Sequence, residues 1–201
     1  DPFYFIYNNN SNGFSLVNSD GSRFTVIKGQ RYKIKFYYIA TETESAHSYI
    51  SAIVSSNIET QNVNNKQQVV LQKAVHSVSS DWYEIEATFE ANVTGYIYIT
   101  LSGRNSTNET NSRYHTVFVD NVSVDLLDDN YVKVSYYDGK TLKESSIGKK
   151  NDKIELPILD VKTGYEFIGW FEDEACTKPV KEDVYPSEDM KYYAGYEMAD
   201  Y

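Results

Sequence analysis

Apolar and polar residues alternate along most of this 201-residue chain with a period of two, the pattern of β-strands that bury one face. In residues 32–36 the apolar positions alternate with lysines, and in residues 82–89 they alternate mainly with glutamates. Turn sequences such as Asp20-Gly21 and Lys28-Gly29 separate the strand-like segments. Many short strands with few helix signals predict antiparallel sheets packed as a sandwich or barrel. The segments that share the pattern are 32–36, 69–74, 82–89, 96–101, 117–119 and 122–124.

A second β pattern begins at Tyr131, directly after the segment 126–130, which ends in Asp-Asp-Asn. The charge changes at the same place, since residues 1–127 carry 12 acidic and 9 basic side chains, whereas residues 128–201 carry 17 and 10. We therefore predict two domains, residues 1–127 and residues 128–201. The strands expected in the second domain are 132–136, 154–157, 164–171 and 191–196.

Composition narrows the possible functions. The formal net charge of −10 disfavours a nucleic-acid partner, because such a partner requires a basic surface. No apolar run approaches the roughly 18 residues of a membrane-spanning helix, so we expect no membrane insertion within this chain. Cys176 is the single cysteine, which excludes an internal disulfide and a four-cysteine metal site.

Catalytic motifs are missing from the sequence. Glu84, Glu86 and Glu90 share one strand face, which we interpret as a solvated surface rather than as the carboxylate pair of a glycosidase. The three histidines have no metal-ligand spacing, and there is no nucleophile motif. We therefore predict that the chain is not an enzyme.

Tyrosine is unusually frequent, with 19 residues against 9 phenylalanines and 2 tryptophans. Its flat apolar ring and polar tip suit a surface that stacks on a sugar or contacts another protein. Alternation places Tyr96 and Tyr98 on one side of a strand and turns Tyr37 away from the core. The alternative is that these tyrosines only cover the sheet or are buried by a neighbouring domain. Further candidates for such a surface are Tyr49, Tyr114, Arg104, Asn105, Gln67 and Gln68.

Four blocks of the first domain resemble jelly-roll carbohydrate-binding modules of the xylan- and β-glucan-binding kind. The blocks are residues 27–37, 81–89, 95–101 and 117–124, in that order. The resemblance implies a jelly-roll sandwich, a packing role for Trp82, and a structural calcium ion held by Asp120. The opening strand usual in such modules, with an Asn-Gly-x-Phe-Glu-like run, is missing before Phe3.

The second domain resembles the Listeria–Bacteroides repeat, also called the internalin B-repeat, over most of residues 131–198. The resemblance implies a small β-grasp-like module that serves as a spacer or adhesive unit in surface proteins of Gram-positive and gut bacteria. It also implies a packing role for Trp170, and Tyr196 stands where the family usually has tryptophan. The matching segments are 134–139, 156–157, 164–171 and 192–196.

These observations lead to one main hypothesis and two alternatives. The chain is expected to be a non-catalytic binding or adhesion fragment of an extracellular bacterial protein, either secreted or on the cell surface. Its first domain would bind a polysaccharide or host glycan through Tyr37, Tyr96 and Tyr98, with Tyr49 and Arg104 beside them. One alternative is a structural stalk or an adhesin that binds a host or neighbouring surface protein without a sugar site. The other is an accessory region of a larger glycoside hydrolase.

Overall fold

The computed structural model describes residues 4–7, 13–17, 21–40, 48–56, 67–75, 81–103, 116–160 and 162–199. The chain divides into two compact units, unit 1 (Asp1–Leu126) and unit 2 (Leu127–Tyr201), and the boundary expected from the sequence lies one residue away. Regular structure in the described residues consists of strands. None of these residues belongs to a helix with the length and hydropathy that a membrane crossing needs.

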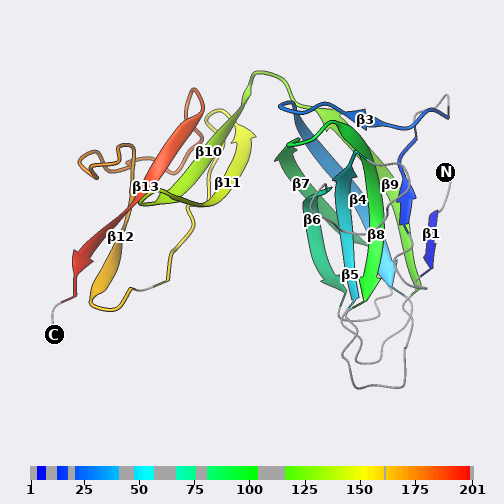
Figure 1. Cartoon of the computed structure of the whole chain (residues 1–201), viewed down its shortest axis with the longest axis horizontal. Coiled ribbons are helices and arrows are strands. Elements are labelled where there is room, and N and C mark those ends of the chain that lie inside the picture. Colours follow the sequence, from blue (N-terminus) through cyan, green and yellow to red (C-terminus); the bar gives the residue numbers. More distant parts are fainter. Residues whose placement is uncertain are drawn as a thin grey trace. The chain divides into compact units, whose positions relative to one another are not determined.

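Unit 1 consists of two sheets that form two layers (Figure 1). In both sheets the neighbouring strands are antiparallel, as the alternation predicted. The β4 sheet has the strand order β1 (Tyr4–Tyr7), β9 (Thr116–Leu126), β4 (Arg31–Ala40) and β7 (Tyr83–Glu90). The β8 sheet has the order β2 (Gly13–Ser15), β8 (Gly95–Gly103), β5 (Ser48–Ser55) and β6 (Gln67–Val75), and β3 (Thr25–Val26) also pairs with β8.

The core of unit 1 lies between these two sheets. Every second residue of β4, from residue 32 to residue 40, is buried, and the intervening side chains are half-buried on the opposite face. Ile34 and Phe36 of the β4 sheet pack in one cluster with Ile50 and Ile97 of the β8 sheet. Each sheet therefore has an inner face in the core and an outer face turned away from it.

Two of the strand assignments in unit 1 differ from the sequence prediction, and a third agrees with it. The segments 117–119 and 122–124 form one strand, β9, because a bulge at Asn121 (φ 52°) absorbs an extra residue opposite Phe36 without ending the pairing. Strand β5 was not predicted, because residues 50–55 are buried on both faces and do not alternate. The segment 69–74, expected to be a strand, lies within β6.

Unit 2 contains one four-stranded mixed sheet. Its two central strands, β10 and β13, are parallel, and each has an antiparallel neighbour at the edge of the sheet. The strand order is β11 (Thr141–Lys149), β10 (Tyr131–Asp138), β13 (Met190–Met198) and β12 (Tyr165–Phe171). Strand β11 was not predicted, because this edge strand is exposed or only half-buried along its length. The segment 154–157 was predicted as a strand, but it belongs to no strand and instead inserts Ile154 into the core.

In the described part of unit 2, three of the six buried core residues are aromatic, namely Tyr136, Trp170 and Tyr192. The buried Tyr136 meets Trp170 edge to face with ring centroids 4.9 Å apart, and it meets Tyr192 in the same way at 6.0 Å. The indole nitrogen of Trp170 donates a hydrogen bond of 2.7 Å to the carbonyl of Pro157. The packing role expected for Trp170 is therefore confirmed.

Gly95 allows β8 to approach β5 closely. A Cβ atom at this position would overlap the backbone carbonyl of Ser55. We expect Gly95→Ala to lower the free energy of unfolding of unit 1 by about 1–3 kcal/mol, the usual cost of overpacking. Ser56→Ala, an exposed neighbour, should change it by less than about 0.5 kcal/mol. Urea denaturation measures both, and equal stabilities of the two variants would contradict this explanation of Gly95.

Burial raises the pKa of Tyr136 from 10.0 to about 12. Because the folded protein then holds this proton more tightly than the unfolded chain, the free energy of unfolding should fall as the pH rises from 10 towards 12. Tyr136→Phe should flatten this decline. Urea denaturation between about pH 9 and pH 11.5 tests it, with Tyr137→Phe on the other face of β10 as the control. Parallel pH profiles for wild type and Tyr136→Phe would contradict the assignment.

Candidate functional site

The candidate tyrosines lie on two different surfaces of unit 1. Tyr37 is on the outer face of the β4 sheet, whereas Tyr49, Tyr96 and Tyr98 are on the outer face of the β8 sheet. The hydrophobic core separates these faces, so the expectation that Tyr37, Tyr96 and Tyr98 bind one ligand together is wrong. Alternation gave each side chain its direction, but it did not show that β4 and β8 belong to different sheets. Arg104, Asn105 and Tyr114 lie outside the described residues.

Tyr37 belongs to a charged network. Its hydroxyl donates a hydrogen bond to the carboxylate of Glu84, and the ammonium of Lys35 lies 5.3 Å from its ring centroid. Lys35 and Glu84 form an ion pair of 2.8 Å. Hydrogen bonds from Lys35 and then from Tyr37 lower the pKa of Glu84, so this carboxylate is ionised at neutral pH. The polar tip of Tyr37 is therefore engaged within the protein.

The rest of this outer face continues the same network. Lys33 pairs with Glu86 at 2.8 Å, and Arg31 pairs with Glu90 at 3.2 Å. The glutamates of β7 therefore share one face, as the sequence predicted, and each pairs with a cation on β4. Such half-exposed pairs each contribute little to stability, but together they satisfy the charges of the face internally.

Asp120 lies on the same face, beside the bulge in β9 and opposite Tyr37 in the register. Its Oδ1 accepts a hydrogen bond of 2.7 Å from the backbone nitrogen of Asn121. Calcium requires six to eight oxygen ligands from several segments. Within the part of the chain that the structure describes, no three acidic, histidine or cysteine side chains come together as a metal site. The described residues therefore do not assemble a calcium site around Asp120, and calcium binding there stays a prediction.

The outer face of the β8 sheet is different in character. Tyr96 is half-buried, and the guanidinium carbon of Arg23 lies 5.5 Å from its ring centroid. Nη1 of Arg23 also donates a hydrogen bond of 3.4 Å to the hydroxyl of Tyr98. One arginine thus spans two tyrosines that stand two residues apart on β8.

The sequence interpretation missed Arg23. It lies after the Asp20-Gly21 turn, forms an antiparallel bridge with Val17, and is followed by Phe24, which packs against the core. This alternation with Phe24 is the signal that could have placed Arg23 on the outer face. The pairing of this segment with β8 is non-local and has no such signal.

Tyr98 was expected to be accessible, but its side chain is only 3% exposed. The reason is its position on β8, between β2 and β5, where it lies opposite Ile53, which is itself fully buried. Its ring therefore contributes to packing on the outer side of the sheet. Neighbouring polar residues of this face are buried as well, namely Ser51, Ser55 and Thr100.

Three further residues singled out from the sequence are Gln68, Gln67 and Trp82. The amide of Gln68 donates to the carbonyl of Glu90 and accepts from the backbone nitrogen of Asn92, both at 2.8 Å, so it joins β6 to the end of β7. Gln67 begins β6, but its side chain lies outside the described atoms. Trp82 was expected to pack in the core, but it is 40% exposed, since it precedes β7 rather than occupying an inward position of that strand.

Comparison with known proteins supports the sequence resemblance of unit 2. Residues 133–195 match the family model of the Listeria-Bacteroides repeat domain. This match confirms the resemblance stated for that part of the chain. A comparison with curated proteins finds no match.

Two solved structures of xylanase modules are similar to the chain. One is the CBM22-1-GH10 modules of endo-1,4-β-D-xylanase 10B from Clostridium thermocellum, complexed with xylohexaose, at 14% identity and a TM-score of 0.36. The other is the CBM22-2 xylan-binding domain of Paenibacillus barcinonensis Xyn10C, at 12% identity and a TM-score of 0.39. The matches cover 66% and 61% of this chain, and 30% and 91% of the respective structures. Both TM-scores are low, so neither likeness carries an argument about function.

The different burial of Tyr96 and Tyr98 predicts different consequences of truncation. Tyr98→Ala would leave a cavity beside Ile53 and should lower the free energy of unfolding by about 3–5 kcal/mol. Tyr96→Ala removes a half-buried ring and should cost about 1 kcal/mol. Urea denaturation of the two variants distinguishes them, and equal losses would show that Tyr98 is not the packing residue described here.

Proposed function

We propose that the chain is a non-catalytic binding fragment of an extracellular bacterial protein. Unit 1 binds a polysaccharide on the outer face of its β8 sheet, where Arg23 and Tyr96 contact the ligand. Unit 2 is a β-grasp-like repeat that acts as a spacer or adhesive unit. This assignment moves the proposed sugar contact away from Tyr37 and gives Tyr98 a supporting role.

The observation that carries this proposal is the contrast between the two outer faces of unit 1. On the β4 sheet, cations and carboxylates pair with one another, and Tyr37 is bonded to Glu84. On the outer face of the β8 sheet, Arg23 contacts the half-buried Tyr96, and the residues beside them are buried, namely Tyr98, Ser51, Ser55, Thr100 and Ile53. The β8 face therefore offers an arginine fork beside a half-buried aromatic ring, whereas the cations of the β4 face are paired with carboxylates.

These groups suit a saccharide for chemical reasons. One face of a sugar ring is made of C–H bonds and packs against apolar surface such as the half-buried ring of Tyr96. The sugar hydroxyls need directional partners, and a guanidinium provides five N–H donors in a fixed plane. The contacts of Arg23 with both tyrosines hold that plane in position before a ligand binds.

The spacer or adhesive role of unit 2 is supported by its match to the Listeria-Bacteroides repeat family. The parallel pairing of its central strands β10 and β13, with antiparallel strands outside them, supports the β-grasp-like description. A location outside the cell is proposed on the same resemblance.

A purely structural role for unit 1 is the second candidate. It is favoured by the burial of Tyr98 to 3% exposure and by the bond of Tyr37 to Glu84, since both tyrosines then serve the fold. Under this alternative the chain binds a host or neighbouring surface protein, or forms a stalk, and retains no sugar.

Affinity electrophoresis tests the two candidates. The full chain is run in gels that contain xylan, mixed-linkage β-glucan or mannan, and binding appears as slower migration. We expect retardation in at least one gel, and we expect Arg23→Ala and Tyr96→Ala each to weaken it about tenfold, which corresponds to about 1.4 kcal/mol. Lys35→Ala, which removes a cation from the other outer face, should migrate as the wild type does.

The controls separate loss of binding from loss of folding. Each variant is accepted only if its melting temperature shows a folded unit 1. Unretarded migration of the folded wild type in these gels and no signal on a microarray of host glycans would favour the structural candidate. If Lys35→Ala weakened retardation as much as Arg23→Ala does, the ligand would bind on the β4 sheet, which would contradict this proposal.

A further inference from the structure

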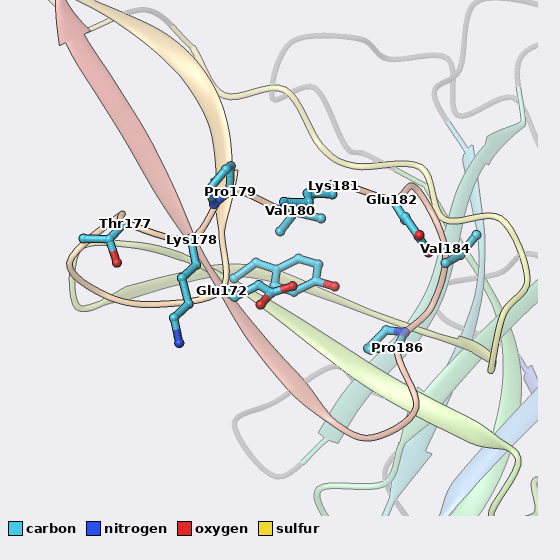
Figure 2. A pocket seen from close by; sticks show the side chains of 10 residues that line it. Glu172, Thr177, Lys178, Pro179, Val180, Lys181, Glu182, Val184 and Pro186 are labelled. Atoms are coloured by element: carbon cyan, nitrogen blue, oxygen red, sulfur yellow. The ribbon is translucent and has the colours of Figure 1, made fainter.

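Unit 2 contains a hollow of about 550 Å³ between β13 and the segment that follows β12. This volume lies within the roughly 300–1,000 Å³ that is typical of small-ligand sites. Figure 2 shows Thr177 and Lys178 on one side of the hollow and Glu182 and Pro186 on the other, with Val180 between them. The hollow is distinct from the outer face of the β8 sheet, because all its lining residues belong to unit 2.

A buried tyrosine lines this hollow. Tyr192 of β13 is 3% exposed, and no residue in the described part of the chain gives its hydroxyl a hydrogen bond. Burial, and after it the charge of Glu172, raises the pKa of Tyr192, so the hydroxyl keeps its proton at neutral pH. Buried polar groups in folded proteins nearly always have a partner. The Tyr192 hydroxyl is therefore a donor and acceptor available to a ligand in the hollow.

Backbone hydrogen bonds fix one wall of the hollow. Asp173 accepts bonds from the backbone nitrogen and the hydroxyl of Thr177 and from the backbone nitrogen of Lys178. The nitrogen of Glu172 donates to the carbonyl of Lys178 at 2.8 Å, and the nitrogen of Val180 donates to a carbonyl of β12 at 2.9 Å. The turn after β12 is thus held against that strand.

The opposite wall is fixed to a different part of unit 2. The nitrogen of Ile154 donates to the carbonyl of Asp183, and the nitrogen of Tyr185 donates to the carbonyl of Asp152, both at 2.9 Å. Val184 also forms an antiparallel bridge with Lys153. Because the two walls are anchored separately, the hollow is preorganised, which reduces the entropy cost of binding.

The chemistry of the lining favours an uncharged ligand. Two carboxylates, Glu172 and Glu182, are balanced by two ammonium groups, Lys178 and Lys181, so neither an anion nor a cation is preferred overall. These groups and the Tyr192 hydroxyl supply hydrogen-bond donors and acceptors together. The remaining lining is apolar, from Pro179, Val180, Val184 and Pro186.

We propose that this hollow is a saccharide subsite that takes one or two units of a neutral glycan chain. Sugar hydroxyls bond to Tyr192, Glu172 and the lysines, while the C–H faces pack on the prolines and valines. Unit 2 would then bind sugar itself and not only separate other domains. Because the aromatic residue that lines the hollow, Tyr192, is only 3% exposed, the affinity of the isolated subsite is expected in the millimolar range.

Titration of the full ¹⁵N-labelled chain followed by NMR tests the subsite. The neutral probes are xylohexaose and cellohexaose, and the charged probe is a galacturonic acid hexamer. We expect a neutral probe to shift the amide signals of Thr177, Lys178, residues 180–185 and Tyr192. Tyr192→Phe should weaken this effect about tenfold, the value of one hydrogen bond, without lowering the melting temperature.

Tyr193→Phe is the matched control. Tyr193 is the next residue of β13, and it stacks on Tyr137 on the opposite face of the sheet with centroids 5.8 Å apart. It should bind as the wild type does. The inference is overturned if neither neutral probe shifts the hollow at millimolar concentration, if only the charged hexamer does, or if Tyr192→Phe binds normally. Signals of Arg23 and Tyr96 report binding by unit 1 separately, so either site can fail alone.

Discussion

Strand register is the constraint on which every surface of unit 1 depends. Successive side chains of a strand point to opposite faces, so burying Ile34 and Phe36 in the core fixes which residues of β4 face outward. The same holds for β8, where Ile97 and Ile99 enter the core and Tyr96 does not. A slip of one residue would exchange the two sets. Core packing, rather than any ligand, therefore decides which groups a partner meets.

The same constraint explains which parts of the fold were readable from the sequence. Strands with one buried face and one partly exposed face, such as β4, show clear alternation of apolar and polar residues. Strand β5 is buried on both faces along residues 50–55, and β11 is exposed or half-buried throughout, so neither alternates. The segment at Ile154 looked like a strand because its apolar residues enter the core, although it pairs with no strand along its length.

The candidate site was readable only in part. Alternation gave Tyr96 and Tyr37 their outward directions, because direction is a local property of a strand. Sheet membership is not local: β4 pairs with β7 and β9, whereas β8 pairs with β5 and β2. Tyr37 is therefore not part of the site on the β8 sheet. Arg23 joins that site through a non-local contact, because its hydrogen-bond partner Tyr98 lies 75 residues away in the sequence. The burial of Tyr98 likewise depends on its neighbour Ile53 across the sheet.

The parallel pairing of β10 and β13 has a mechanical consequence. These strands are the first and last of the described strands of unit 2, and they lie side by side (Figure 1). Residues 134–137 of β10 are in register with residues 190–193 of β13. Tension applied at the two ends of the unit pulls these strands past each other along their length. Their backbone bonds are then loaded in shear and must rupture together rather than one after another. We expect a domain whose first and last strands are paired in this way to resist stretching, which would suit a protein that is pulled by flow or by attachment to a surface.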